Sequence, residues 1–145
     1  MIRPITAEQV LRIRHPVLRP GRPIEDAVFP CDTEALARHL GAFDGADRLV
    51  GVVTIHPAPW PGGPPDPGPW QLRGMATLPE VRGLGYGRAL VEAAERVVKV
   101  AGGSFLWCNA RVAAVEFYAK LGWEVVGEEF DIPTVGPHYW MKKVP

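Results

Sequence analysis

Residues 82–88 read Arg82-Gly83-Leu84-Gly85-Tyr86-Gly87-Arg88, a glycine loop between an expected strand and the clearest amphipathic helix of the chain. The first turn of a helix leaves backbone N–H groups unpaired and carries a partial positive charge. Glycines let an anion approach that backbone, because no Cβ stands in the way. The loop therefore predicts a cradle for a phosphate or pyrophosphate group. A glycine-rich turn that binds no ligand is the alternative.

The spacing of the glycines does not fit the two common nucleotide fingerprints. The dinucleotide pattern G-x-G-x-x-G requires a third glycine where this chain has Arg88, counting from Gly83, or Leu90, counting from Gly85. The Walker pattern requires Gly-Lys-Ser/Thr, and the loop contains no such triplet. The failed dinucleotide pattern, together with the lack of a ribose-binding acidic residue on a second strand, argues against a nucleotide-binding oxidoreductase, the alternative from a different functional class.

Hydrophobic periodicity around the loop predicts a mixed α/β fold of the α+β type. Residues 71–78 and 105–109 are expected to be strands, and residues 88–101 a helix with its apolar positions on one stripe. A strand–helix–strand crossover of this kind implies parallel pairing. We expect further strands at 2–5, 39–43, 48–56, 123–129 and 138–143, helices at 7–15 and 112–121, and a helical turn at 33–38.

The composition indicates one cytoplasmic domain over residues 1–145. A chain of 145 residues with 47% hydrophobic residues can bury a core without a metal or a disulfide. Sixteen basic residues balance sixteen acidic ones, which argues against a nucleic-acid surface or a polybasic membrane patch. No segment approaches the ~20 apolar residues of a membrane span, and the N-terminus resembles no signal peptide. Two cysteines are too few for a disulfide scaffold, and Cys108 is expected to be a buried thiol.

A proline-rich segment separates two expected strands. Seven of the thirteen residues in 57–69 are proline and three are glycine, so the segment can be neither a helix nor a central strand. We expect a long loop between two paired strands. Trp60 and Trp70 bracket it, and they either pack the loop onto the body of the protein or line an interface.

The glycine loop also resembles a family signature. Arg82-x-x-Gly85-x-Gly87 is similar to the Q/R-x-x-G-x-G/A pattern of the GNAT family, the GCN5-related N-acetyltransferases. Residues 75–79 resemble the family strand before this loop, and residues 117–123 resemble its F/L-Y-x-x-x-G-F segment, with Trp for the usual Phe. Residues 109–118 and 136–138 most resemble the small bacterial branch that includes the ElaA-like proteins.

This resemblance implies a fold and a cofactor. Family members have a mixed central sheet flanked by helices, and a splayed strand pair holds acetyl-CoA. The loop would hold the coenzyme A pyrophosphate, and the strand before it would hold the pantetheine arm through its backbone. Arg111 stands where many members have an asparagine that contacts the cofactor, and Asn109 is a second candidate for that contact. The implied cofactor-binding residues are Met75, Ala76, Thr77, Arg82, Gly83, Leu84, Gly85, Tyr86, Gly87, Arg88 and Arg111.

The implied reaction is direct acetyl transfer to a primary amine of a small molecule or a peptide, without an acyl-enzyme or a metal. Tyr118 is the implied general acid, and a core tyrosine is the alternative. His138 is the favoured base, because it lies in the segment that faces the acceptor in the family and because histidine titrates near neutral pH. Carboxylates that also remain candidates for the base are Glu80, Glu116, Glu128 and Asp131.

Two questions about partners stay open at this stage. A non-catalytic acyl-CoA-binding sensor or partner module on the same fold would bind the cofactor without using Tyr118. The terminal strands and the proline-rich segment could serve a homodimer, although no feature of the sequence requires one.

The first expected helix is followed by a basic segment. Thr6 and Gln9 have the spacing of a capping box, which predicts where this helix starts. Residues 12–22 contain four arginines and His15. They form either a solvated, charge-balanced face or a group near the acceptor entrance that binds a carboxylate or a phosphate of the substrate.

Overall fold

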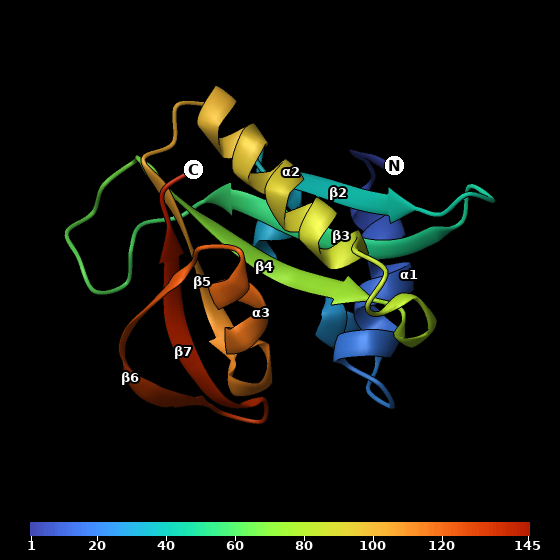
Figure 1. The fold of residues 1–145 in the computed structure, drawn as a ribbon. Coiled ribbons are helices and arrows are strands. Elements are labelled where there is room, and N and C mark those ends of the chain that lie inside the picture. The colour runs from blue at the N-terminus through green and yellow to red at the C-terminus, as the bar shows by residue number, and fades with distance from the viewer.

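Seven strands form one mixed sheet in a computed structural model that describes residues 1–145. The strands are β1 (Ile2–Pro4), β2 (Arg38–Phe43), β3 (Leu49–Pro57), β4 (Pro69–Thr77), β5 (Phe105–Arg111), β6 (Glu124–Ile132) and β7 (Gly136–Lys143). Their order across the sheet is β1-β2-β3-β4-β5-β7-β6 (Figure 1). All neighbouring strands are antiparallel except β4 and β5, which are parallel as the crossover predicts. The predicted mixed fold is confirmed.

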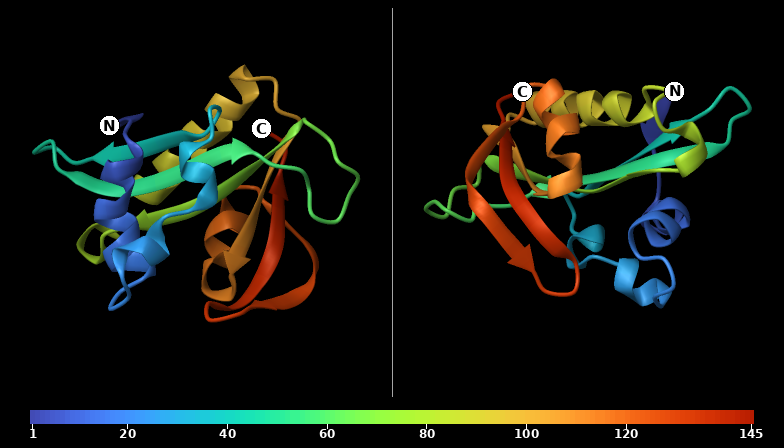
Figure 2. Two further views of the ribbon diagram at one scale, coloured as in Figure 1. Left: turned by 180° about the vertical axis from the view of Figure 1, so that it is seen from behind. Right: turned by 60° about the horizontal axis from the view of Figure 1, so that its bottom comes forward.

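Three helices cover the two faces of the sheet. α1 (Ala7–Leu18) lies on one face, and α2 (Tyr86–Val100) and α3 (Val115–Lys120) lie on the other (Figure 2). Short 3₁₀ turns at Ile24–Ala27 and Pro30–Thr33 lie on the same side as α1. No helix is long and apolar enough to span a membrane.

The apolar stripe of α2 forms much of the core. Leu90, Val91, Ala94 and Val98 are fully buried against the sheet, at 0% exposure. Burial of each large aliphatic side chain contributes about 1.5–3 kcal/mol relative to its exposure. α1 packs a smaller apolar set against the opposite face of β3 and β4. The helix predicted from the periodicity at 88–101 is therefore confirmed, and it begins two residues earlier than expected.

β4 and β5 separate after only three residue pairs. Residues 69–71 of β4 face residues 105–107 of β5. Beyond this point residues 108–111 of β5 pair only with β7, and residues 73–77 of β4 pair only with β3. The two strands diverge from there (Figure 1). The splayed strand pair is confirmed, and it leaves a gap inside the sheet.

β4 carries a bulge beside this gap. Its register with β3 shifts between Arg73 and Ala76, so that Gly74 and Met75 stand opposite a single residue. Gly74 has φ +65°, a conformation that strongly favours glycine. A Cβ at this position would lie 2.9 Å from Nε of Arg14. The bulge therefore needs glycine for two independent reasons.

A buried ion pair lies under the bulge. The guanidinium of Arg14 donates to both carboxylate oxygens of Asp32, at 2.7 and 3.1 Å, and Arg14 is 0% exposed. It also donates to Oγ1 of Thr54 at 2.8 Å and to the carbonyl of Ala27 at 2.9 Å. The interpretation of residues 12–22 as a solvated face is therefore wrong for Arg14.

α1 starts as predicted and ends later than predicted. Gln9 N donates to Oγ1 of Thr6 at 3.1 Å and Thr6 N donates to Oε1 of Gln9 at 2.8 Å, which completes the capping box. The helix continues past Pro16, because a proline removes only its own N–H donor. Arg19 N still donates to the carbonyl of His15 at 2.9 Å.

Two other expected elements differ from the structure. The helical turn expected at 33–38 lies earlier, as a 3₁₀ helix at Pro30–Thr33, and only a single turn, with Ala37 N donating to the carbonyl of Glu34 at 3.1 Å, follows it. The helix expected at 112–121 is a 3₁₀ turn at Val112–Ala114 followed by the short α3. Its first turn has no side-chain cap, so the sequence carries no signal for this boundary.

The proline-rich segment forms the connection between β3 and β4, as expected. Trp60 packs edge-on against Phe105, Trp107 and Trp140, with ring centroids 6.1, 6.0 and 5.4 Å apart. Trp70 belongs to the core of the protein. Of the two alternatives for these tryptophans, packing of the loop onto the body holds for Trp60.

Candidate active site

A cavity of about 690 Å³ opens at the gap between β4 and β5, in front of the glycine loop. We call it the glycine-loop cavity. Of the residues implied to bind the cofactor, only Leu84 does not line it, and that side chain is 68% exposed. The lining residues are Val17, Leu18, Met75, Ala76, Thr77, Val81, Arg82, Gly83, Gly85, Tyr86, Gly87, Arg88, Arg111, Ala113, Ala114, Phe117 and Tyr118.

The glycine loop presents bare backbone to this cavity. Gly83 and Gly85 have φ +81° and +90°, and a Cβ on either would meet nothing within 4 Å. Gly85 caps α2, no side chain caps its first turn, and that turn contains no acidic residue. A Cβ on Gly87 would lie 3.0 Å from Met75 and 3.3 Å from Phe117. The loop therefore fits an anionic group at the positive end of α2.

The edge of β4 also faces the glycine-loop cavity. Ala76 and Thr77 pair on one side with β3. No strand pairs with them on the other side, because β5 has turned toward β7. An open strand edge of this kind can bind an extended ligand through backbone hydrogen bonds.

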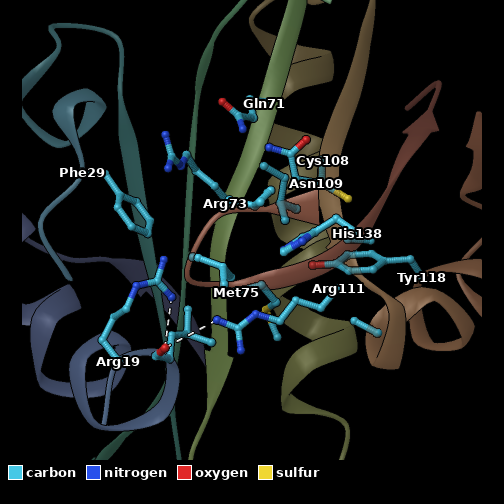
Figure 3. A pocket seen from close by; sticks show the side chains of 17 residues that line it. Arg19, Phe29, Gln71, Arg73, Met75, Cys108, Asn109, Arg111, Tyr118 and His138 are labelled. Atoms are coloured by element: carbon cyan, nitrogen blue, oxygen red, sulfur yellow. Dashed lines mark hydrogen bonds between the residues drawn. The ribbon is translucent and has the colours of Figure 1, made fainter. Parts of the chain in front are cut away.

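A second cavity, of about 190 Å³, lies on the other side of this junction (Figure 3). We call it the arginine cavity. Leu18, Met75, Arg111, Ala114 and Tyr118 line both cavities, so the two meet at these residues. The residues that line only the arginine cavity are Arg19, Phe29, Gln71, Leu72, Arg73, Gly74, Cys108, Asn109, Ala110, Ile132, Val135 and His138.

Tyr118 stands where the two cavities meet. Its ring packs against Phe117 and Trp123, with centroids 5.0 and 5.3 Å apart, and only 6% of the residue is exposed. Its hydroxyl forms no hydrogen bond within the chain and points into the arginine cavity (Figure 3). Burial raises the pKa of Tyr118 well above its ordinary value, and Cys108 adds to the effect. The hydroxyl therefore keeps its proton at neutral pH.

His138 lies in the same cavity with one nitrogen engaged. Its Nδ1 lies 2.7 Å from the carbonyl oxygen of Gly136. A carbonyl only accepts, so Nδ1 is the donor, and in the neutral ring Nε2 then carries the lone pair. The ring stacks on Phe130 at 6.1 Å, and the residue is 3% exposed. The second nitrogen is therefore available as a proton acceptor.

Comparison with known proteins identifies the family. The Acetyltransferase (GNAT) family model matches residues 7–123. The chain is 38% identical over 143 residues to the uncharacterized N-acetyltransferase YitI of Bacillus subtilis strain 168, and the match covers 98% of this chain and 94% of that protein. The chain belongs to the GNAT family.

Solved structures share this GNAT fold. The crystal structure of Escherichia coli ElaA superposes with a TM-score of 0.77 at 18% identity, over 99% of this chain and 98% of ElaA. An aminoglycoside 6′-N-acetyltransferase complexed with coenzyme A superposes with a TM-score of 0.72 at 20% identity, over 99% of this chain and 96% of that one. This GNAT protein is an acetyltransferase, and its acetyl donor is acetyl-CoA.

The two candidates at the end of β5 have different positions in this GNAT protein. Arg111 lines both cavities, and its guanidinium donates to the carbonyl of Leu18 at 3.4 Å. Asn109 lines only the arginine cavity. It therefore lies away from the loop that would hold a cofactor.

Among the five candidate bases, only His138 lines the glycine-loop cavity or the arginine cavity. Glu80 lies near Arg48 on the surface, at 3.5 Å, and Glu116 pairs with Lys120 at 3.4 Å. The remaining two candidates are exposed on β6. The carboxylates are therefore poorly placed for proton transfer at the junction.

Cys108 lines the arginine cavity and is 2% exposed. Burial raises the pKa of its thiol far above the ordinary value of 9.0. It therefore remains a neutral thiol, which is a poor nucleophile. Cys31 is also buried, and neither cysteine forms a disulfide.

Sequence reasoning missed one residue of this GNAT site and left another undecided. Arg73 projects from β4 into the arginine cavity, and Arg19 enters it from the end of α1 (Figure 3). A charged residue between Leu72 and Gly74, inside a central strand, was the available signal for Arg73. Arg19 belonged to the basic segment whose role the sequence left open.

Proposed function

We propose that this acetyltransferase transfers the acetyl group directly to a primary amine of a small molecule or a peptide, within a single domain of residues 1–145. The position of Tyr118, whose side chain lines both cavities, carries the proposal. A donor in the glycine-loop cavity and an amine in the arginine cavity would meet beside it. Direct transfer needs such a shared wall, because no enzyme-bound acetyl group moves between the two sites.

The glycine-loop cavity would hold the donor. Acetyl-CoA, when bound, supplies the acetyl group as a thioester. Residues 82–88 would bind its pyrophosphate at the start of α2, with Arg82 and Arg88 adding positive charge. Backbone groups of residues 75–77 and the side chain of Arg111 would hold the pantetheine arm. Good orientation of two reactants contributes about 7–11 kcal/mol to lowering a barrier.

Tyr118 would act as the proton donor. Its raised pKa keeps Oη protonated at neutral pH, so it can donate to negative charge on a leaving group at the junction. The same property makes it unsuitable as a base. The hydroxyl has no partner within the chain and is free to make that contact.

His138 would accept the proton that the amine must lose. A lysine-like amine with a pKa of about 10.4 is neutral in only about one molecule in a thousand at pH 7. His138 lines the arginine cavity, where that amine would lie, and its Nε2 makes no hydrogen bond within the chain.

The names of the structural neighbours do not define the acceptor. The neighbour solved with coenzyme A is described as an aminoglycoside acetyltransferase, but 20% identity supports a common fold and not a common substrate. The acceptor of this chain has to be inferred from the arginine cavity itself.

Two measurements test the proposed function. Thermal unfolding with saturating acetyl-CoA, against NAD and ATP, measures donor binding, and ligand at a hundred times its Kd adds about 2.7 kcal/mol. Release of free coenzyme A in the presence of a panel of primary amines measures transfer. Amine-dependent release supports the proposal. Stabilisation by acetyl-CoA with no release for any amine would instead indicate a non-catalytic binding module.

A further inference from the structure

Three arginines line the arginine cavity, and no acidic side chain lines it with them. Arg19 follows α1, Arg73 projects from β4, and Arg111 ends β5 (Figure 3). No aspartate or glutamate is among the residues that line this cavity. None of the three arginines forms a salt bridge, although the chain pairs seven of its other cationic side chains and one histidine with carboxylates.

The polar contacts of these arginines leave most of their donors free. Arg19 and Arg111 both donate to the carbonyl of Leu18, at 3.0 and 3.4 Å. That carbonyl belongs to the last turn of α1, where a helix carries only about half a negative charge. Arg73 stacks on the ring of Phe29 at 4.1 Å and makes no hydrogen bond within the chain.

The two acidic side chains that follow the cavity-lining Phe29 in the chain, Asp32 and Glu34, already have partners. Asp32 is paired with the buried Arg14 at 2.7 Å. Glu34 lies 3.2 Å from Nδ1 of His56. Burial and then the neighbouring arginines, with Arg111 first among them, lower the pKa of Arg19, as expected for like charges held close together. A bound anion would relieve that repulsion.

We propose that the acceptor is a small amine that also carries a carboxylate or a phosphate group, and that Arg19, Arg73 and Arg111 bind this anionic group. The inference rests on the proposed function, because it names the acceptor class for the same site. A guanidinium binds either anion through two parallel N–H donors, so carboxylate and phosphate share this chemistry.

The anionic group of the donor does not account for these arginines. The donor pyrophosphate would lie at the glycine loop, and Arg19 and Arg73 line only the arginine cavity. Only Arg111 lines both. The arginine cavity has a volume of about 190 Å³, below the roughly 300–1,000 Å³ of pockets that enclose drug-sized ligands, so the acceptor is compact.

Gln71 and Asn109 add neutral polar groups beside the arginines. Oε1 of Gln71 lies 3.0 Å from Nε2 of His56, which fixes the orientation of its amide. The wall of the cavity therefore supplies donors for an anion as well as groups that can bind an uncharged polar substituent.

The first arm of the test compares matched acceptors in the release of coenzyme A. α-Amino acids are paired with their carboxamides, phosphoethanolamine is paired with ethanolamine, and putrescine is the cationic probe. Each charged acceptor is expected to have a kcat/KM about 10- to 100-fold above that of its uncharged partner, because hydrogen bonds to charged groups carry about 1.5–3 kcal/mol. The amino acid and phosphate pairs show which anion is preferred. Equal rates within both pairs, or a preference for putrescine, would overturn the proposal.

The second arm measures anion binding without catalysis. Inorganic phosphate is titrated into protein saturated with coenzyme A, and the unfolding temperature is followed. Arg73→Gln and Arg19→Gln should each weaken phosphate binding at least tenfold. Arg96→Gln is the matched control, because Arg96 is exposed on α2 and lines neither cavity. Equal phosphate affinity in all four proteins would show that no anion site exists in this cavity.

The two arms separate this inference from the proposed function. If no amine is acetylated while phosphate binding depends on Arg73, the anion site stands and the transfer reaction fails. If amines are acetylated without preference for an anionic group and Arg73→Gln does not change the affinity for phosphate, the transfer reaction stands and the anion site fails.

Discussion

The guanidinium of Arg14 donates to both carboxylate oxygens of Asp32, at 2.7 and 3.1 Å, directly below the bulge of β4. The backbone N–H of Phe29 donates to the same carboxylate at 2.9 Å. This pair connects α1 with the 3₁₀ turn at Pro30–Thr33, and Arg14 also donates to Thr54 of β3 and lies close to Gly74 of β4. It therefore supports the part of the strand whose backbone faces the glycine-loop cavity.

Loss of this buried pair should strongly destabilise the protein. Asp32→Ala leaves the guanidinium of Arg14 buried without a counter-charge, which typically costs about 3–5 kcal/mol. Asp26→Ala is the matched control, because Asp26 pairs with Arg22 at 3.0 Å on the surface, where a pair contributes at most about 1 kcal/mol. Chemical denaturation measures the free energy of unfolding of both variants. Similar losses in the two variants would contradict the role assigned to burial.

Gly85 and Gly102 lie at the two ends of α2 and provide a matched pair of substitutions. Gly85 belongs to the glycine loop, and Gly102 follows the last turn of the helix. Both have positive φ, of +90° and +79°, and a Cβ on either would meet nothing within 4 Å. Gly85→Ala and Gly102→Ala should each cost about 1–2 kcal/mol of stability, because both force alanine into the left-handed region. Only Gly85→Ala should lose affinity for coenzyme A, by tenfold or more, since its methyl group occupies the space in front of α2. Calorimetric titration measures the affinity, and equal affinities would remove the loop from the binding site.

Tyr118→Phe should lower kcat by about 100-fold or more and leave the affinity for coenzyme A unchanged. The change removes the hydroxyl at the junction and keeps the ring that packs on Phe117 and Trp123. Tyr139→Phe is the control, because Tyr139 lines neither cavity. Steady-state rates of coenzyme A release, together with titration, separate the two effects. A full rate in Tyr118→Phe would exclude Tyr118 as the proton donor.

Stability should fall as the pH rises above about 9. Burial raises the pKa of Cys108 above its ordinary value of 9.0, so the unfolded thiol ionises at a pH where the folded thiol does not. The unfolded state then binds fewer protons, and each such group lowers the free energy of unfolding by up to about 1.4 kcal/mol per pH unit. Tyr118 adds a second contribution above its ordinary value of 10.0. Cys108→Ala should reduce the slope between pH 9 and 10, and an identical slope in both proteins would contradict this origin.

Features that depend on neighbours in the sequence could be predicted. The stripe of α2, the capping box of Thr6 and Gln9, and the loop at 57–69 follow from spacing and from the chemistry of proline. The splayed strands followed from the family resemblance of residues 70–143 and not from periodicity. These elements define the gap in the sheet and the glycine loop, and with them much of the glycine-loop cavity.

Features that depend on distant parts of the chain could not be predicted. Arg14 and Asp32 are 18 residues apart, and Arg14 looks like one more charge in a basic segment until α1 is packed on the sheet. The arginine cavity combines the end of α1 with two central strands. Charges from separate elements become one binding surface only through the tertiary fold.

Three residue pairs hold β4 to β5, which makes this contact a narrow joint within the sheet. The sheet consists of two sections, one of β1 to β4 and one of β5, β7 and β6, which are connected near Gln71 and Trp107. Residues of both β4 and β5 line each of the two cavities. A rotation of a few degrees about this joint would widen or narrow both spaces together. The geometry of the donor and acceptor sites thus depends on the same three-pair joint, and Trp60 packs edge-on against Trp107 beside it.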